Sequence, residues 1–301
     1  MADLSSGSPA TPHAQKDSVQ AGGEEKSFFQ IVVHSFFIIP FLIAVFCVLL
    51  FTAMKLLTEE RRTAYDYLED VKIGGLTKRW QGAFELSKIL SNPALIPADD
   101  RFTAELIAAF EQAKHDDHRV RQYLALAMGR TGRKEFIAPL LEGLRDEKED
   151  NLAALIYALG MLSDSASARS LHEYADHPVA RIRSITMVAL GNIASEESRG
   201  VLRNHLHDPE PNVQWGAALS LAKIRDLSGK EVIIKLLDRS YLSQFSEVDL
   251  EEQDYMILAA MEAVSYFSDP DLNKRIQELS QSDQNMQVRS KALDIIKNFG
   301  K

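Results

Sequence analysis

Cysteine is nearly absent from this chain of 301 residues, and the one that occurs, Cys47, cannot form a disulfide within the chain. The fold therefore does not require an oxidising compartment. Proline and glycine are also few for an all-β protein of this length, with 10 and 15 residues. Residues that favour helices, such as Leu, Ala, Glu and Lys, are plentiful instead. These scarcities exclude internal cross-linking and favour an all-α protein.

An excess of positive charge is missing as well. The formal net charge is -9 at pH 7, and the acidic balance continues after the apolar segment described below. Such a surface repels a phosphate backbone, so we expect no nucleic-acid partner.

Motifs that carry chemistry are not found either. The sequence has no glycine-rich phosphate loop, no serine elbow and no Cys/His nucleophile pair. Its closely spaced histidines are His115 and His118, His172 and His177, and His205 and His207. None of these pairs has a clear third ligand beside it. We therefore predict a protein without catalytic residues, metal or cofactor.

One long apolar run lies near the N-terminus. Between Ser27 and Met54 there is no Asp, Glu, Lys or Arg, and the 24 residues from Ile31 to Met54 would form a helix about 36 Å long. The hydrocarbon core of a bilayer is about 30 Å thick. We predict a single transmembrane helix at residues 27–57, in contact with the membrane through residues 31–54. Pro40 should kink it.

A cleaved signal peptide is the alternative interpretation of this run. Its leading region would be short and basic, whereas 26 mostly polar residues precede the run here, among them Asp3 and Asp17. A lipoprotein signal is disfavoured because Phe46 is too large for the position before Cys47. We therefore interpret the run as a retained anchor.

The flanking cations predict the orientation of this anchor. The two cations before the run are Lys16 and Lys26, and the six within about 25 residues after it are Lys55, Arg61, Arg62, Lys72, Lys78 and Arg79. Positive residues favour the cytoplasmic side, so the C-terminal part should be cytoplasmic and the tail of residues 1–26 outside. The tail, rich in Ser, Gly, Ala and Pro, should be disordered. The opposite topology stays open, because Glu24 and Glu25 adjoin Lys26.

A repeat of 31 residues occupies the rest of the chain. Similar ten-residue segments begin at residues 120, 151, 182 and 213, and less regular copies begin at residues 78, 256 and 288. Counting the first residue of each copy as position 0, positions 4, 7, 8 and 11 are mostly apolar or small, which is one face of a helix. Position 7 is small and position 9 is often glycine, so a neighbouring helix can approach closely. Because another amphipathic helix precedes each copy, the sequence predicts about seven helix pairs within residues 58–301.

These copies resemble the HEAT repeat, in the short form first named from phycobilisome lyases. The resemblance depends on Val/Ile-Arg-x-x-x-x-x-Ala-Leu-Gly at residues 182–191, the same pattern with Met128 at residues 120–129, and the Asp208-Pro209 turn. It implies a right-handed α-solenoid that binds proteins. Deoxyhypusine hydroxylase, an enzyme of this superfamily, holds iron with several His-Glu pairs. This sequence has only His172-Glu173, which we interpret as surface residues.

Positions 2, 3 and 6 of the copies point away from the core stripe and are candidates for partner binding. The residues that we select there are Trp80, Phe84, Tyr123, Leu126, Tyr157, Trp215 and Leu219. Large aromatic residues at outward positions are typical interface anchors. The alternative is that they pack between adjacent repeats.

A second candidate surface is the insertion from Ser240 to Asp254. It carries Tyr241 and Phe245 among five acidic residues and could contact a basic segment of a partner. The alternative, which we favour slightly, is an excursion into solvent.

Arginine recurs at position 1, as Arg79, Arg121, Arg183 and Arg289. We interpret these arginines as structural and not as a basic binding ladder. Most of them can pair with acids in the turn just before them, such as Asp116, Asp117 or Asp283, and so join adjacent repeats.

The sequence as a whole predicts a membrane-anchored scaffold on the cytoplasmic face of a bacterial membrane. Residues 58–72 are expected to be helical, which would join the anchor almost directly to the solenoid. The partner would be a protein, in a membrane-associated complex. A lyase-like or chaperone-like factor that acts on a cofactor protein is the alternative.

Overall fold

The computed structural model describes residues 34–58, 62–145 and 149–298. The chain divides into two compact units, Met1–Arg61 and Arg62–Lys301, which are taken separately below. The predicted tail of residues 1–26 lies outside the described residues.

The first unit contains the apolar helix. A π-helical turn, His34–Ile38, leads into α2 (Ile39–Thr58). The turn ends just before Pro40, whose missing N–H would otherwise be needed in the α-helical ladder. Within the described part of the chain one helix is long and apolar enough to cross a membrane, Ser35–Lys55, with a mean hydropathy of 2.8 and no buried portion.

The prediction of a helix over residues 58–72 is wrong at residues 62 and 63; Thr58 ends α2, and residues 59–61 lie outside the described part of the chain. Arg62 and Thr63 are not helical, and α3 begins at Ala64. Thr63 is the N-cap because its hydroxyl accepts from the Asp66 N–H, while the Asp66 carboxylate accepts the Thr63 N–H at 2.6 Å. This reciprocal capping box satisfies two backbone donors and fixes where the helix starts.

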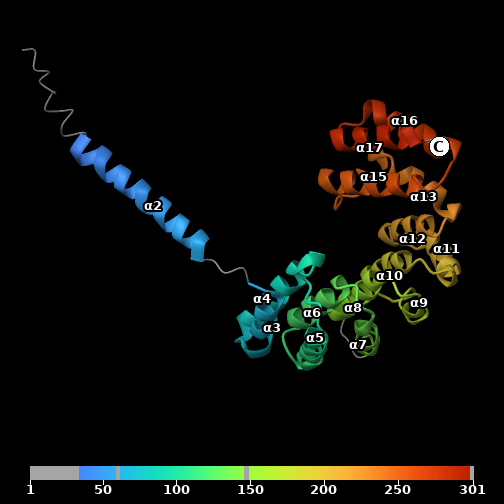
Figure 1. Cartoon of the computed structure of the whole chain (residues 1–301). Helices are drawn as coiled ribbons and strands as arrows, with labels where there is room; N and C mark the ends of the chain where they lie inside the picture. The colour runs from blue at the N-terminus through green and yellow to red at the C-terminus, as the bar shows by residue number, and fades with distance from the viewer. Residues whose placement is uncertain (1–33, 59–61, 146–148, 299–301) are drawn as a thin grey trace, which may run out of the picture. The chain divides into compact units, whose positions relative to one another are not determined.

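The second unit is a solenoid of seven helix pairs in chain order (Figure 1). The pairs are α3 (Ala64–Ile73) with α4 (Leu76–Ile89), α5 (Asp100–Gln112) with α6 (His118–Arg130), α7 (Ile137–Gly143) with α8 (Glu149–Leu162), α9 (Ser165–His172) with α10 (Ala180–Ile193), α11 (Arg199–Asn204) with α12 (Pro211–Lys223), α13 (Lys230–Leu236) with α15 (Leu250–Val264), and α16 (Pro270–Ser282) with α17 (Met286–Asn298). The short helix α14 (Arg239–Leu242) lies between α13 and α15. No strand occurs among the residues that the structure describes, and the expected all-α solenoid is confirmed.

The turns between helices are set by the polar residues that the sequence places there. Asp117 and Asp249 act as N-caps: their carboxylates accept from the N–H of Arg119 at 3.0 Å and of Glu252 at 2.9 Å. Pro211 and Pro270 start α12 and α16, where a missing N–H costs nothing. Six of the second helices begin two residues before their repeat copy, whereas α15 begins at Leu250, six residues before the copy at residue 256.

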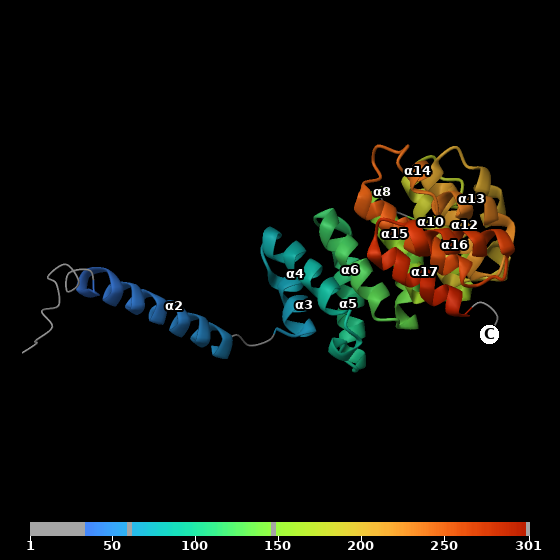
Figure 2. The same cartoon turned by 90° about the horizontal axis from the view of Figure 1, so that it is seen from above.

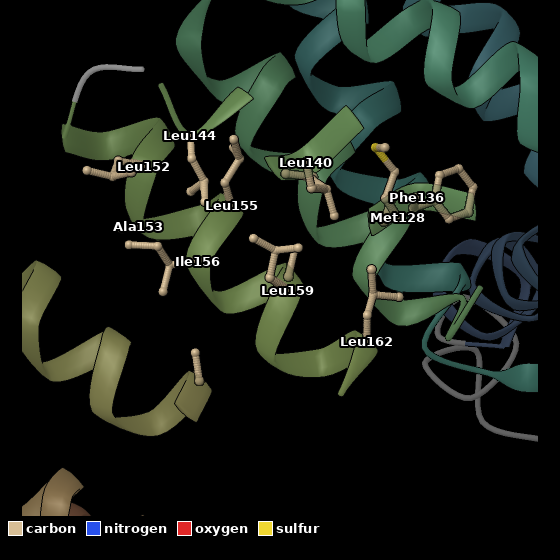
Figure 3. Packing of buried hydrophobic residues seen from close by; sticks show 14 of the residues in the cluster. Met128, Phe136, Leu140, Leu144, Leu152, Ala153, Leu155, Ile156, Leu159 and Leu162 are labelled. Carbon is tan, nitrogen blue, oxygen red and sulfur yellow. The ribbon is translucent and has the colours of Figure 1, made fainter. Parts of the chain in front are cut away.

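The residues at position 8 fill the centre of the solenoid. Leu86, Met128, Leu159, Leu190, Leu221 and Val264 are all fully buried. Figure 3 shows Met128 close to Phe136 and Leu140 of the following repeat, with Leu159 nearby on α8. Burying a side chain of this size stabilises the fold by about 1.5–3 kcal/mol, so this one position carries much of the core.

Position 9 sets how closely the second helices approach. A Cβ built on Gly129 would lie 2.9 Å from Cα of Ala158, and one on Gly160 would lie 2.7 Å from Cα of Ala189. In both pairs a position-9 glycine meets the small residue at position 7 of the next copy. The predicted close approach is confirmed, and it continues as far as Gly191.

This close approach stops at α12, where Ala222 takes the place of glycine. The buried core also divides there into two clusters. One face of α12 contributes Val213 and Ala217 to the first cluster, and another contributes Trp215 and Ala218 to the second. Helix α12 is thus the joint between a regular stack, α4 to α12, and a terminal block that contains α13 to α17.

Candidate partner-binding surface

Position 6 of the second helices forms an apolar row that the core does not cover. The residues of this position-6 row are Phe84, Leu126, Tyr157, Val188 and Leu219, on α4, α6, α8, α10 and α12. Phe84 and Tyr157 are 39% and 41% exposed, and the other three are half-buried. The five helices stack in order, so the row crosses five consecutive repeats. An apolar side chain left partly in water in repeat after repeat is typical of a contact surface.

The α4–α6 end of the row is aromatic. The rings of Phe84 and Tyr123 meet edge to face at 5.2 Å. Trp80 is half-buried, with the guanidinium of Arg119 stacked 4.5 Å above its ring. These contacts order the side chains in advance, which lowers the entropy cost of binding through them.

For Trp215, which occupies position 2, the packing alternative applies and not the exposed one. It is only 4% exposed, and its indole N–H donates to the hydroxyl of Tyr241 at 3.1 Å. Its ring also meets that of Phe245 at 5.0 Å. The aromatic residues of the insertion cover the tryptophan, so its role is mainly in packing.

In the insertion from Ser240 to Asp254, the two selected aromatic residues pack toward the solenoid, while many of their neighbours are exposed. Tyr241 and Phe245 are half-buried, and Leu242 and Val248 are buried in the core of the terminal block. Leu250 is the one apolar side chain of the insertion that is well exposed, at 63%, and the acidic Glu247 and Glu251 are exposed as well.

A cleft of about 560 Å³ opens between α10, α12 and α15, which Figure 2 shows together in the C-terminal half of the solenoid. Of the selected residues, Trp215 and Leu219 line it. Val188 and Leu219 are also the last two members of the position-6 row, so the row runs into the cleft. The cleft lies at the joint where Ala222 replaces glycine, and the aromatic cluster of Trp215 borders it.

Several lining residues were not selected from the sequence. Val188 occupies position 6 and could have been found from the repeat register alone. Tyr255, Met256 and Tyr266 lie in the least regular part of the repeat, where the register does not identify an outward position. Tyr255 is 70% exposed, the largest apolar surface on α15 that faces the cleft.

The position-1 arginines are structural, as expected, but two of them pair with an acid in a different turn from the predicted one. Arg183 donates two parallel hydrogen bonds to Asp208, at 2.8 and 2.9 Å, and Arg79 pairs with Asp116. Both aspartates lie in the turn of the following repeat, not in the turn just before the arginine.

The two other position-1 arginines bind backbone carbonyls. Arg121 donates to the carbonyl of Phe110, and Arg289 donates to that of Asp283 at 2.5 Å. The Asp283 carboxylate instead holds Arg239 of the preceding repeat. All four position-1 arginines therefore make contacts within the solenoid, and they do not form a basic surface for binding a partner.

Two buried carboxylates that accept hydrogen bonds from arginine side chains, those of Asp208 and Asp283, have lowered pKa values and so favour the ionised form. Burial alone would raise the pKa of Asp208, but the hydrogen bonds from Arg183 and from the Glu210 N–H hold it below the ordinary value. Asp283 is similar: burial opposes ionisation, and Arg239 lowers the pKa.

The charges at the edge of the cleft are mainly negative. Glu210, Glu252 and Glu262 line it, and none of them forms an ion pair with another described residue. The two cations of the cleft are engaged: Arg181 pairs with Asp150 at 2.6 Å, and Lys223 donates to the Asn192 side chain at 2.6 Å.

The histidines do not gather into a metal site in the part of the chain that the structure describes. His172 lies against Ser198, with 3.1 Å between Nε2 and Oγ, and burial lowers its pKa. His205 binds the carbonyl of Val201 through Nδ1 at 2.8 Å. Each ring has a local structural partner.

Comparison with known proteins agrees with this architecture. Residues 103–188 and 177–249 match the family model of HEAT repeats, which supports HEAT repeats in this part of the solenoid. The complex of CpcE and CpcF of phycocyanin lyase from Nostoc sp. PCC7120 is similar in structure, with a TM-score of 0.55 and 19% identity over 80% of this chain and 96% of that chain.

Two further structures are similar over most of their length. An archaeal HEAT-like repeats protein from Thermococcus onnurineus NA1 has a TM-score of 0.42 and 16% identity, covering 79% of this chain and 97% of that chain. Human deoxyhypusine hydroxylase in complex with glycerol has a TM-score of 0.33 and 16% identity, covering 78% and 96%. At these identities the likeness concerns the fold alone. No curated protein matches the sequence.

Proposed function

Taking HEAT repeats as the building unit, we propose that the protein is a membrane-anchored adaptor. Residues 27–57 hold it in the membrane, and the second-helix surface of the solenoid binds another protein of a membrane-associated complex. The solenoid lies on the cytoplasmic side, and the tail of residues 1–26 lies outside. The length and hydropathy of Ser35–Lys55 support the anchor, and the flanking cations support the orientation.

The observation that carries this proposal is the position-6 row. Five partly exposed apolar side chains follow one another across neighbouring helices that lie about 8–10 Å apart. The row therefore extends over roughly 30–40 Å, a length that suits a macromolecular partner better than a small molecule. No cluster of metal ligands occurs among the described residues.

The test is chemical crosslinking in intact membranes, followed by detergent purification of the tagged chain and mass spectrometry. We expect one reproducible protein partner with crosslinks to the second helices. Phe84→Asp and Tyr157→Asp place charges on exposed positions of the row and should abolish its recovery. Leu95→Asp is the matched control, because Leu95 is a comparably exposed apolar residue that lies outside the row. This variant should leave recovery of the partner unchanged. Equal recovery from all variants contradicts binding through the row.

Anchoring and orientation are tested separately. The full chain should stay in the membrane pellet after alkaline carbonate extraction, and a chain without residues 27–57 should not. Alkaline phosphatase fused after Lys301 should be inactive, because the enzyme needs the oxidising exterior to form its disulfides. An active fusion would reverse the proposed localisation.

A lyase-like or chaperone-like factor that acts on a cofactor protein is the second candidate, favoured by the similarity to the phycocyanin lyase complex. An absorption spectrum and a metal analysis of the purified full chain test it. A bound chromophore or a stoichiometric metal would favour this candidate over the adaptor.

A further inference from the structure

The cleft between α10, α12 and α15 has the geometry of an incomplete helix bundle. On α12 its lining residues are Asn212, Trp215, Gly216, Leu219, Ser220 and Lys223, and on α15 they are Glu252, Tyr255, Met256, Ala259, Glu262 and Ala263. Both sets follow the spacing i, i+3, i+4, i+7, which is one face of a helix. Helix α10 adds Ser184, Ile185 and Val188. Three helices thus turn a complete face toward one shared space.

The size of the cleft defines how an occupant would fit. From Glu252 to Ala263 the α15 face is about 16 Å long, and a helix of this length with a diameter of about 10 Å fills about 1,300 Å³. The cleft of about 560 Å³ accepts the side chains on one face of such a helix, but not the whole helix. The occupant would therefore lie along the groove with one face inserted and the other in water.

The chemistry of the walls defines the two faces of that occupant. Leu219, Met256 and the exposed ring of Tyr255 would receive apolar side chains. Glu210, Glu252 and Glu262 stand around them without ion pairs among the described residues, whereas Arg181 is paired with Asp150. Lys223 donates to the neutral Asn192 side chain and keeps its charge, so among the described lining residues three unpaired acids face one unpaired cation. The charge balance of the rim is thus negative, and a complementary helix carries Lys or Arg beside its apolar face.

We propose that this groove binds one amphipathic, basic helix of a partner protein. The inference depends on the adaptor function proposed above and names the part of the partner that docks. The helix would complete a four-helix arrangement with α10, α12 and α15, its apolar residues on Leu219 and Met256 and its cations beside Glu252 and Glu262.

The test uses the full chain in phosphatidylcholine nanodiscs, with empty nanodiscs as background. The probes are two labelled, stapled 18-residue helices with the same leucine face, flanked by lysine in one and by glutamate in the other. Fluorescence anisotropy should give about tenfold tighter binding of the lysine helix. Equal affinity of the two helices overturns the proposal.

Variants locate the binding. Glu252→Gln with Glu262→Gln should bring the two affinities within about threefold of each other, whereas Glu135→Gln with Glu231→Gln, two exposed acids outside the groove, should change nothing. Ala259→Trp fills the groove and should prevent binding of both helices. Tyr255→Lys alters an exposed side chain, so the fold is retained, and should weaken the lysine helix most. Unchanged binding by these last two variants also overturns the proposal.

Two further outcomes separate this inference from the adaptor function. If Ala259→Trp converts a dimer of the chain into monomers, the occupant of the groove is a second copy and the proposal is wrong. If membrane crosslinking recovers a partner through the position-6 row of α4 to α8 while neither probe binds, the adaptor function stands and the groove proposal fails.

Discussion

Arg183 of one repeat and Asp208 of the next face each other as a planar, two-bond pair at the joint between α10 and α12. The side chains are 12% and 5% exposed, so the pair is largely withdrawn from water. Arg183 also donates to the carbonyl of His177 at 3.0 Å, and one guanidinium thereby joins three segments of two repeats.

We predict that Arg183→Leu lowers the free energy of unfolding by about 3 kcal/mol, because it leaves the buried Asp208 carboxylate without its partner. Arg181→Leu, on the same helix, removes an exposed pair with Asp150, 53% and 62% exposed, and should cost less than about 1 kcal/mol. Urea unfolding followed by circular dichroism measures both. Equal losses would show that burial does not determine the contribution of the pair.

The second prediction concerns acid. Because the pKa values of Asp208 and Asp283 are lowered in the folded chain, their contribution to stability is present above the ordinary aspartate pKa of 3.8 and is lost as pH falls through the lowered values. The melting temperature should therefore fall steeply below about pH 4. In Asp208→Asn with Asp283→Asn it should be lower at pH 7 and depend less on pH. Parallel pH profiles would contradict this assignment.

The third prediction concerns the close helix approach. Gly191→Ala should destabilise by about 1–3 kcal/mol, since its Cβ would lie 2.8 Å from Cα of Ser220 and overpack two backbones. Gly200→Ala meets open space in α11 and should be neutral, or stabilise by up to about 1 kcal/mol through helix propensity. Thermal unfolding compares the two. A stabilising Gly191→Ala would mean that the stack separates at little cost.

The fourth prediction distinguishes the two tryptophans. Trp215→Ala should lower the unfolding free energy by about 3–5 kcal/mol, because it empties a buried site and breaks the bond to Tyr241. Trp80→Ala should cost about 1 kcal/mol, since the ring is only half-buried. Only the Trp80 variant is therefore a clean probe of partner binding. Similar losses in urea unfolding would place Trp80 in the core as well.

The repeat made much of the fold predictable. The 31-residue spacing, the small residues at position 7 and the glycines at position 9 are local patterns, and each position-9 glycine of the regular stack contacts the position-7 residue of the next copy. Phe84 and Tyr157 are 39% and 41% exposed, in agreement with the outward direction that position 6 predicts.

The remaining features depend on contacts that no periodicity encodes. Trp215 has an outward position in the register, but an insertion about 26 residues later covers it with Tyr241. Likewise, the sequence around Arg183 offers acids on either side, and only the stacking of repeats selects Asp208. The cleft depends on two such features. It lies beside α12, where Ala222 stands in place of a position-9 glycine, and one of its lining residues, Glu252, comes from the insertion.

The glycine contacts also bear on how the chain folds. Gly129 with Ala158, Gly160 with Ala189 and Gly191 with Ser220 each join residues that are 29 apart. Forming any of them closes a loop of about one repeat, so the entropy cost of closure stays nearly constant along the stack. Folding can therefore begin at any of these three contacts and spread to both sides without a long-range search. The pairing of α12 with α15 spans a longer loop that includes the insertion, and it should be the slowest step to form and the first to open.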